Sequence, residues 1–391
     1  MGSAPPSATV RLVRSLADIA PEAWDACAVP DPATRNPFVQ HAFLKALEES
    51  GTVSDRTGWS PHHVALEIDG RLAGCAPAYL KAHSQGEYIF DYGWADAYER
   101  AGGDYYPKLQ IAVPFTPVPG PRLLVAPTAG TTPVRQTLAS AIGEVVRQNG
   151  LSSAHVTFTT ETEWRELAAA GFLQRTDQQF HWTNQGYSSF EQFLESFASR
   201  KRKAVRKERE TARSAGLDIE WLLGRDITEA HWDAFFAFYL DTGNRKWGRP
   251  YLNRTFFSLL HEAMPESCLL IMARKGPDYI GGALNLVGGD CLYGRYWGAI
   301  EHYACLHFEV CYYQAIEYAI ANGLSRVEAG AQGEHKLARG YLPTPTYSAH
   351  FIADPRFRAA VSDFLARERR HVERAIDALT TYAPYKRGPE T

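Results

Sequence analysis

The sequence repeats one order of elements twice, and this repeat constrains the fold more than any other feature. In the first half, two apolar runs flank Asp69-Gly70 within 64–80, a pattern that predicts a β-hairpin with a tight turn. In the second half, 270–287 has the same pattern and turns at Gly276-Pro277. Each hairpin is the first element of a repeated series.

A helix and a strand are predicted later in each half. Amphipathic segments at 132–148 and 307–321 predict helices, and each is followed by the tetrapeptide Asn-Gly-Leu-Ser. Asn-Gly is a helix stop, because glycine adopts the left-handed conformation after the last turn without strain. Short apolar strands are predicted next, at 155–159 and 326–330.

Because three successive elements agree, we predict two similar α/β domains, 1–184 and 185–391. The chain of 391 residues has the length of two ordinary domains, each long enough to bury a core. The first domain has a Tyr-, Gly- and Pro-rich excess at 91–131. The second ends in a predicted helix at 356–380, and the tail at 386–391 is expected to be disordered.

The second domain opens with a strongly basic helix, predicted at 189–215 from a capping-box start and an apolar face. Its charge is either a solvated helix face or a docking surface for polyanions such as RNA or phosphate groups. In a chain with a net charge of −3, this local density favours docking. The residues predicted to hold a polyanion are Arg200, Arg202, Lys203, Arg206 and Lys207.

Composition and missing motifs exclude several classes of protein. The net charge of −3 excludes a globally basic nucleic-acid coat protein. The six cysteines have no C-x-x-C or Cys/His zinc spacing, so we predict no metal site and a reducing compartment. No apolar run has the length of a signal peptide or a membrane span, which predicts a soluble, cytoplasmic protein. Dinucleotide, P-loop, H-E-x-x-H and G-x-S-x-G fingerprints are missing, which argues against the enzymes that carry them.

Two polar clusters are left as candidate sites. The first lies in 91–110, predicted to be a long loop between strands, and loops of that length are usually functional. The alternative is a tyrosine-rich loop that only caps a core. The candidate substrate-binding residues here are Asp91, Trp94, Tyr105, Tyr106 and Lys108.

The second cluster lies in 307–339, where glycines are interleaved with charged residues, so that donors can approach an anion closely. Glu328 suits a general base if burial raises its pKa, and Lys336 with Arg339 can supply charge to phosphates. The alternatives are a structural Glu328–Arg339 ion pair and a surface position for His335. The candidate catalytic residues are Glu309, Glu328 and Lys336, and the candidate substrate-binding residues are His307, Tyr313, Gln332, His335 and Arg339.

Over most of 36–352 the chain resembles the FemAB-like family, often labelled peptidoglycan biosynthesis/recognition, within the GNAT acyltransferase superfamily. The resemblance rests on SFASRKRKAVRKERETARSAGLDIE and on HFEVCYYQAIEYAIANGLSRVEAGAQGEHKLARGYLP in the second half. The stretch 91–106 and PKLQIAVPFTPVPGPRLL are typical of the family in the first half. The resemblance implies two tandem GNAT-like domains, each a mixed twisted sheet flanked by helices, and transfer of an acyl or aminoacyl group to an amine.

The resemblance also implies co-substrates rather than a tightly bound cofactor. Fem-type enzymes use an aminoacyl-tRNA and a peptidoglycan precursor, whereas ordinary GNAT enzymes use acyl-CoA, whose pyrophosphate rests on N–H groups at a helix N-terminus. A CoA site needs a loop with free backbone N–H groups to bind the pyrophosphate, and the chain departs from this requirement in two places. The segment 113–124 contains four prolines, which have no N–H to offer, and Gly298 is the only glycine just before the second helix. These departures weaken acyl-CoA as the donor without excluding it.

We therefore predict an N-acyltransferase that acts on an amine of a small or cell-wall-type precursor, with the second domain favoured as the active one. Glu328 or Glu309 is the expected base, and Lys336, which falls where Fem-type enzymes place a loop lysine, is expected to act with Arg339 on the donor or the oxyanion. His307 and the 91–106 segment are expected to hold the acceptor, and the basic helix the tRNA if that is the donor. The alternative is a non-catalytic protein that recognises peptidoglycan fragments or RNA on the duplicated fold.

Overall fold

The computed structural model describes residues 7–246, 250–331 and 333–386, and its contacts divide the chain into two compact units. Unit 1 comprises Met1–Asp177 and Pro345–Glu373, and unit 2 comprises Gln178–Thr344 and Arg374–Thr391. The division differs from the expected linear one, since Pro345–Glu373 belongs to unit 1 although it follows most of unit 2 in the sequence. Of the tail expected to be disordered, 387–391 lies outside the described residues.

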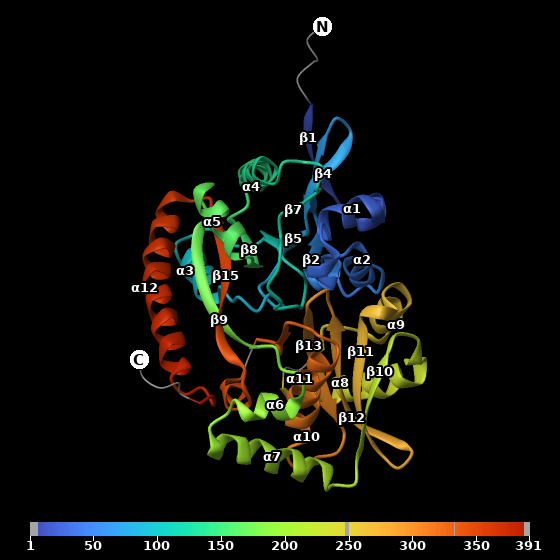
Figure 1. The fold of residues 1–391 in the computed structure, drawn as a ribbon. Coiled ribbons are helices and arrows are strands. Elements are labelled where there is room, and N and C mark those ends of the chain that lie inside the picture. The colour runs from blue at the N-terminus through green and yellow to red at the C-terminus, as the bar shows by residue number, and fades with distance from the viewer. Residues whose placement is uncertain (1–6, 247–249, 332, 387–391) are drawn as a thin grey trace. The chain divides into compact units, whose positions relative to one another are not determined.

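Unit 1 contains a four-stranded antiparallel sheet in the order β1-β3-β4-β7 (Figure 1). Its strands are β1 (Ala8–Val13), β3 (His63–Ile68), β4 (Arg71–Ala76) and β7 (Leu124–Val125). The predicted first hairpin is confirmed as β3 and β4. Asp69 and Gly70 have φ values of 50° and 75°, and positive φ at both central residues is what a type I′ hairpin turn requires.

Further strands of unit 1 are hydrogen-bonded in the order β15-β8-β6-β5-β2. They are β2 (Trp59–Pro61), β5 (Ala78–Lys81), β6 (Lys108–Ile111), β8 (Ser153–Thr159) and β15 (Leu342–Ile352), of which β15 begins in unit 2. The pair β6–β8 is parallel. A parallel pair needs a crossover, and α4 (Thr131–Gln148) lies between these strands in the sequence, as the repeat predicts.

The predicted long loop at 91–110 is not a loop throughout, so that prediction is wrong at both ends: a helix forms in its first part, and β6 begins at Lys108. Its residues form α3 (Tyr92–Arg100), whose Trp94 and Ala95 share a buried apolar cluster with Val361 and Leu365. This long-range packing buries one face of the helix and stabilises it. The remaining helices of unit 1 are α1 (Pro21–Ala28), α2 (His41–Glu49), α5 (Glu161–Ala169) and most of α12 (Pro355–Thr380).

The strands of unit 2 are hydrogen-bonded in the order β10-β11-β12-β13-β14-β9. They are β10 (Asp218–Leu223), β11 (Cys268–Lys275), β12 (Asp278–Val287), β13 (Cys291–Ala299), β14 (Arg326–Glu328) and β9 (Leu173–Thr183), which begins in unit 1. The second predicted hairpin is confirmed as β11 and β12. The parallel pair β13–β14 is separated by helical residues, as β6 and β8 are in unit 1. Strand β14 is shorter than predicted, because Gly330 adopts a φ of 77°.

The basic helix predicted as one element is two helices, α6 (Phe190–Glu195) and α7 (Ser199–Arg213). The chain is extended between them, where Phe197 forms a β-bridge with Tyr385 and the Ala198 N–H donates to the Pro384 carbonyl. The other helices of unit 2 are α8 (Glu229–Lys246), α9 (Arg254–Ala263), α10 (Leu306–Phe308) and α11 (Gln314–Ala321). A π-helical turn, Glu309–Tyr313, joins α10 to α11.

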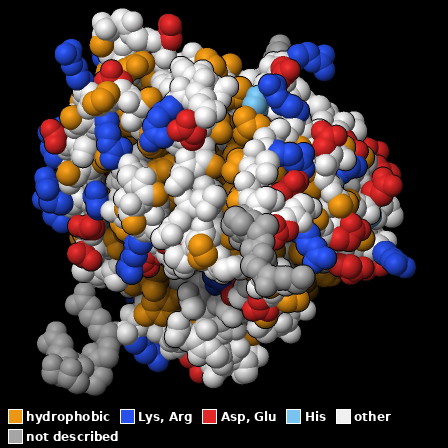
Figure 2. Space-filling model, turned by 90° about the horizontal axis from the view of Figure 1, so that it is seen from above, with side chains coloured by type: hydrophobic (Ala, Val, Ile, Leu, Met, Phe, Trp, Pro, Cys, Tyr) orange, Lys and Arg blue, Asp and Glu red, His pale blue; other side chains and the backbone are white. Residues whose placement is uncertain are grey.

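The surface view in Figure 2 shows Lys and Arg side chains interspersed with Asp and Glu side chains over one face, among hydrophobic and uncharged residues. Within the described parts of the chain, no helix combines the length and the apolar character that a bilayer crossing requires.

Candidate functional site

Strands β13 and β14 part after three paired residues, and we call this place the strand-parting site. The ladder runs from Cys291 opposite Arg326 to Tyr293 opposite Glu328, where β14 ends while β13 continues along β12. Gly294 follows on one strand and Gly330 on the other. A β-carbon added at Gly330 would have the Gly294 carbonyl oxygen, 4.0 Å away, as its nearest neighbour. Two residues without side chains therefore border the point where the strands separate.

Glu328 brings a buried carboxylate to the strand-parting site. Its Oε1 accepts from Arg326 Nε at 3.2 Å, whereas Oε2 has no hydrogen-bond partner among the described residues. Its ladder partner on β9 is His181, whose pKa is lowered by burial. A buried carboxylate oxygen without a donor is costly, so this atom is poised to accept a proton or a hydrogen bond. The Glu328–Arg339 ion pair considered as an alternative is wrong, since each residue pairs elsewhere.

Lys336 brings a buried amine to the same place. It lies on the 3-10 helical turn Glu334–Arg339 with 2% of its surface exposed, and Nζ donates to the Gly330 carbonyl at 2.8 Å. The pKa of Lys336 is lowered to about 8, chiefly by burial; Cys311 acts against this shift and the Arg295 guanidinium adds to it. Because that pKa is above 7, the amine is mostly an ammonium at neutral pH, which suits it to stabilise an oxyanion.

Glu309, unlike Glu328, has hydrogen bonds to both of its carboxylate oxygens. It is fully buried on the π-helical turn, and Arg209 donates to it through Nε at 3.0 Å and through Nη2 at 2.8 Å. Gln314 Nε2 donates to its Oε1 at 2.8 Å. These bonds occupy the carboxylate, and they fix α7 to the π-helical turn.

Arg339 and Tyr313 also bind α7 rather than a free anion site. Arg339 Nη2 donates to Glu208 Oε1 at 2.9 Å, its guanidinium lies 3.4 Å from the centre of the Phe308 ring, and Tyr313 donates to the other Glu208 oxygen. His335 Nε2 lies 2.9 Å from the Tyr312 hydroxyl, and the His307 ring lies 6.0 Å from that of His335. Gln332 lies outside the described residues.

The outer face of α7 is basic and exposed. Arg200, Lys203 and Lys207 point away from the buried face formed by Val205, Arg209 and Ala212. Arg202 is half-buried, and Arg206 forms an exposed ion pair with Glu191 at 2.6 Å. A groove of about 470 Å³ runs beside these residues, lined in part by Arg206, Arg209 and Arg213.

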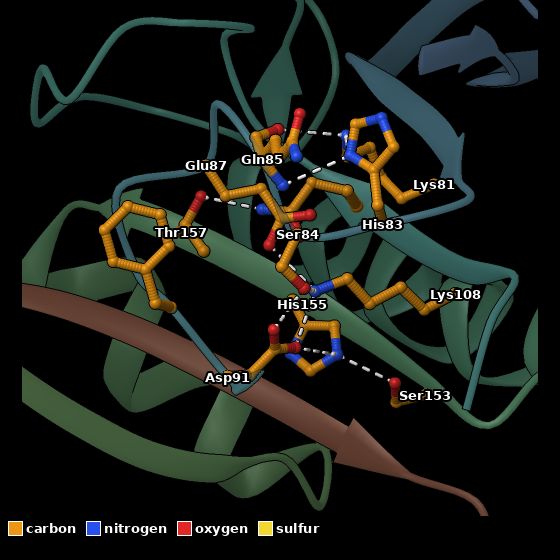
Figure 3. A network of polar contacts seen from close by, with 12 residues as sticks. Lys81, His83, Ser84, Gln85, Glu87, Asp91, Lys108, Ser153, His155 and Thr157 are labelled. Atoms are coloured by element: carbon orange, nitrogen blue, oxygen red, sulfur yellow. Dashed lines mark hydrogen bonds and ion pairs between the residues drawn. The ribbon is translucent and has the colours of Figure 1, made fainter. Parts of the chain in front are cut away.

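The first predicted cluster forms a buried network in unit 1 rather than an open site (Figure 3). Lys108, fully buried on β6, donates to Ser84 Oγ at 2.9 Å, Glu87 Oε2 at 2.8 Å and Asp91 Oδ2 at 2.5 Å. Asp91 also accepts from the Tyr105 hydroxyl at 2.5 Å. Three acceptors saturate the ammonium, and this places Lys108, Asp91 and Tyr105 in the structural core of unit 1.

The electrostatics of this network follow from burial and pairing. Burial acts against the Asp91 carboxylate, but the Lys108 ammonium outweighs it and holds the Asp91 pKa well below its usual value. Burial raises the pKa of Glu87 to about 7 and lowers the pKa of Lys81 to about 7. It also lowers the pKa of His155 to about 3, so this ring is neutral.

The two remaining residues of the first cluster lie at the edges of the network. The Tyr106 hydroxyl lies 2.7 Å from Ser84 Oγ, and Trp94 packs edge-on against His350 with ring centres 4.9 Å apart. Three further members of the network, Lys81, Glu87 and His155, were not predicted from the sequence. Polar residues at alternate positions of otherwise apolar strands, as in 78–81 and 108–111, are the signal that points to a buried polar sheet face.

The parallel strands of unit 1, β6 and β8, have no comparable opening between them, because residues 113–122 occupy the corresponding position. Gly120 N–H donates to the Phe158 carbonyl at 2.9 Å, so the segment 113–122 bonds directly to β8. Arg122, fully buried, donates to the carbonyls of Thr157 and Val118. In the described ranges, no group of three or more His, Cys, Asp or Glu side chains is arranged to hold a metal ion.

Comparison with known proteins places the chain in a family. The model of the FemAB-like family, described as peptidoglycan biosynthesis/recognition, matches residues 15–387. A search of curated protein sequences found no match. The crystal structure of FemX is similar with a TM-score of 0.55 and 12% identity, covering 88% of this chain and 98% of FemX.

Two further solved structures show the same fold at low identity. The C-terminal domain (DUF2156) of a putative lysylphosphatidylglycerol synthetase from Agrobacterium fabrum has a TM-score of 0.54 and 10% identity, covering 88% of this chain and 96% of that one. The L-PGS of Bacillus licheniformis has a TM-score of 0.51 and 8% identity, with coverages of 85% and 98%. The predicted fold class, mixed sheets flanked by helices in two units, is thus confirmed, and the chain belongs to the FemAB-like family.

Proposed function

We propose that the protein is an N-acyltransferase that moves an acyl or aminoacyl group from an ester or thioester donor to an amine. We place the transfer at the strand-parting site of unit 2. One observation carries this proposal: the last paired residue of β14, Glu328, has a buried carboxylate oxygen without a donor, and the carbonyl of Gly330, two residues further on, holds the buried Lys336 ammonium. Membership of the FemAB-like family supports a peptidoglycan-related acceptor.

The two side chains match the two charges that acyl transfer creates. The amine nitrogen attacks the carbonyl carbon and loses a proton, which Glu328 Oε2 accepts. The carbonyl oxygen gains negative charge in the tetrahedral intermediate, and the Lys336 ammonium stabilises it. When the intermediate collapses, the bond to the donor oxygen or sulfur breaks, and that leaving atom takes the proton from Glu328.

Two classes of donor fit the proposed reaction, an aminoacyl-tRNA and an acyl-CoA. The exposed face of α7 favours an aminoacyl-tRNA, whose phosphates it can bind, and the prolines of 113–122 act against a CoA site in unit 1. Both donors are cytoplasmic, and we place the protein there. Thermal unfolding with each donor separates them, since a ligand at about a hundred times its Kd stabilises the fold by about 2.7 kcal/mol.

Gly294→Ala tests the transfer site itself. The added methyl group would meet Asn285 Oδ1 at 3.4 Å, which is ordinary contact, so the fold should accept it while the space between the strands narrows. We expect the transfer rate to fall at least tenfold and the melting temperature to stay unchanged or rise slightly, because alanine orders a strand better than glycine.

A matched control is Gly93→Ala on α3, where an added β-carbon would meet no atom within 4 Å. This variant should keep its full rate. Full activity of Gly294→Ala would place the transfer elsewhere. A wild-type protein that binds donors and amines without turnover would support the recognition function instead.

A further inference from the structure

Glu328 has a titratable neighbour on β9, the strand that flanks β14 on the side away from β13. The antiparallel ladder pairs Glu328 directly with His181, so the two side chains project from the same face of the sheet. Residues paired in this way have β-carbons about 5 Å apart, within reach of a carboxylate and an imidazole ring. His181 keeps only 9% of its surface exposed. A buried histidine therefore lies beside the carboxylate of the proposed base.

The hydrogen bond of the His181 ring determines which of its nitrogens can take up a proton. Nε2 lies 3.2 Å from Gln179 Oε1. An amide oxygen only accepts hydrogen bonds, so Nε2 carries the hydrogen of the neutral ring and Nδ1 carries the lone pair. Nδ1 is thus the atom at which the ring can be protonated.

The charged groups that act on the His181 ring come from β14 and from the Glu334–Arg339 turn. Burial lowers the pKa of His181; the Glu328 carboxylate, the strongest of these charges, acts against the shift, whereas the Arg326 guanidinium and the Lys336 ammonium add to it. The ring is therefore uncharged at pH 7, and its protonation is coupled to the charge on Glu328.

The proposed reaction removes two protons from the acceptor, and Glu328 holds only one at a time. An alkylamine is an ammonium ion with three N–H bonds at pH 7, whereas the amide product has one. Of the two protons that leave the nitrogen, one ends on the departing oxygen or sulfur atom. Arg326 Nε donates to Glu328 Oε1 at 3.2 Å, which leaves Oε2 as the oxygen without a donor among the described residues. Glu328 must pass on the first proton before it can accept the second.

We propose that His181 Nδ1 accepts the first proton from Glu328, and that this relay lets the enzyme take its acceptor as an ammonium ion; the inference rests on the proposed function. The acceptor ammonium gives one proton to Glu328 Oε2, and the proton moves on to His181 Nδ1. The carboxylate then takes the second proton as the neutral amine attacks the carbonyl carbon. The second proton leaves with the donor oxygen or sulfur, and His181 releases the first to solvent. His181 acts through Glu328 and does not touch the acceptor.

An NMR titration of the histidine rings in the full-length protein tests the coupling of His181 to Glu328. Glu328→Gln removes the carboxylate that acts against the effect of burial, so it should lower the pKa of His181 further. His261 is the internal control, because its Nε2 donates to the Gly224 carbonyl at 2.7 Å, and its titration should stay unchanged. The same pKa of His181 in the wild type and in Glu328→Gln would overturn the inference.

A matched pair of acceptors tests the relay itself. In Nα-acetyl-L-canaline an oxygen replaces the methylene beside the attacking amine of Nα-acetyl-L-ornithine, so at pH 7 the canaline derivative is uncharged there and the ornithine derivative is an ammonium ion. Each is assayed with the full-length protein and an aminoacyl-tRNA donor. In His181→Gln, kcat/KM should fall about a hundredfold for the ornithine derivative and less than about threefold for the canaline derivative. The loss on the ornithine derivative should shrink between pH 7 and pH 9.5, because more of it then arrives uncharged.

His261→Gln, the matched histidine control, should keep the wild-type ratio between the two acceptors. An equal loss on both acceptors in His181→Gln would give His181 a structural role, overturning the relay and leaving the transferase standing. Coupled titration of His181 and Glu328 without turnover of either acceptor, with aminoacyl-tRNA or acyl-CoA as donor, would overturn the proposed function and leave only a pair that shares a proton. Neither coupling nor turnover would overturn both.

Discussion

Replacing Lys336 with methionine should make the protein more stable and less active at the same time. The drop of the Lys336 pKa from 10.5 to about 8 corresponds to about 3 kcal/mol that opposes folding while the side chain is charged. Methionine has a similar length and no charge, so it removes this cost. It also removes the 2.8 Å bond to the Gly330 carbonyl, which is worth about 1 kcal/mol. We expect a net gain of about 1–2 kcal/mol in the free energy of unfolding at pH 7, together with a loss of about 10²–10³ in kcat.

The stability gain of Lys336→Met should decrease as the pH rises above about 8. The folded pKa of Lys336 is lower than the unfolded one, so between about 8 and 10.5 the unfolded chain binds the extra proton and wild-type stability rises with pH. The charge penalty is therefore fully present below pH 8 and fades above it. Urea titrations at pH 7 and pH 9.5 should show the advantage of Lys336→Met shrinking by about 2 kcal/mol.

Lys207→Met on the exposed face of α7 is the matched control for charge removal. It should change the free energy of unfolding by less than about 0.5 kcal/mol, and it should leave the pH dependence of that free energy unchanged. If Lys336→Met were less stable than the wild type at pH 7, or if its advantage did not vary with pH, then Lys336 would not be a buried, destabilising ammonium. An unchanged kcat would remove it from the transfer site.

Two further predictions concern the rest of the molecule. Lys108→Met leaves Asp91 and Glu87 buried without their cation, and it should lower the free energy of unfolding in urea by about 3–5 kcal/mol. In the wild type, the pKa of Asp91 lies below its unfolded value, so its stabilisation should be complete above pH 4 and should be lost as the pH falls further. On α7, combined replacement of Arg200, Lys203 and Lys207 by glutamine should leave melting unchanged and weaken tRNA binding. The slope of log affinity against log salt should then fall by about 2–3, and an unchanged slope would show that RNA does not contact this face.

The elements that sequence predicted correctly are those set by neighbours along the chain. The turn at Asp69-Gly70 and the helix stop at Asn149-Gly150 depend on left-handed backbone conformations that local residue types determine. Hydrophobic periodicity placed the repeated hairpins, helices and strands, and the resemblance to the FemAB-like family was confirmed. The choice of Lys336 and Glu328 as catalytic residues stays a prediction.

The sequence did not determine which side chains pair with one another or which of them are buried. The sequence predicted an open loop that binds substrate through Asp91, Tyr105 and Lys108. In the structure, α3 and the sheet enclose these residues in one hydrogen-bonded network. Arg339 pairs with Glu208, which is 131 positions earlier in the chain, rather than with the nearby Glu328.

The strand-parting site likewise became visible only in three dimensions. The parting of β13 and β14 after Tyr293 and Glu328, and the irregular register that sets Asn285 opposite Gly294, are not visible in the sequence of either strand. Local sequence determines which backbone conformations are favourable. Desolvation, ion pairing and the direction of a side chain depend on which segments pack together, and those contacts exist only once the chain has folded.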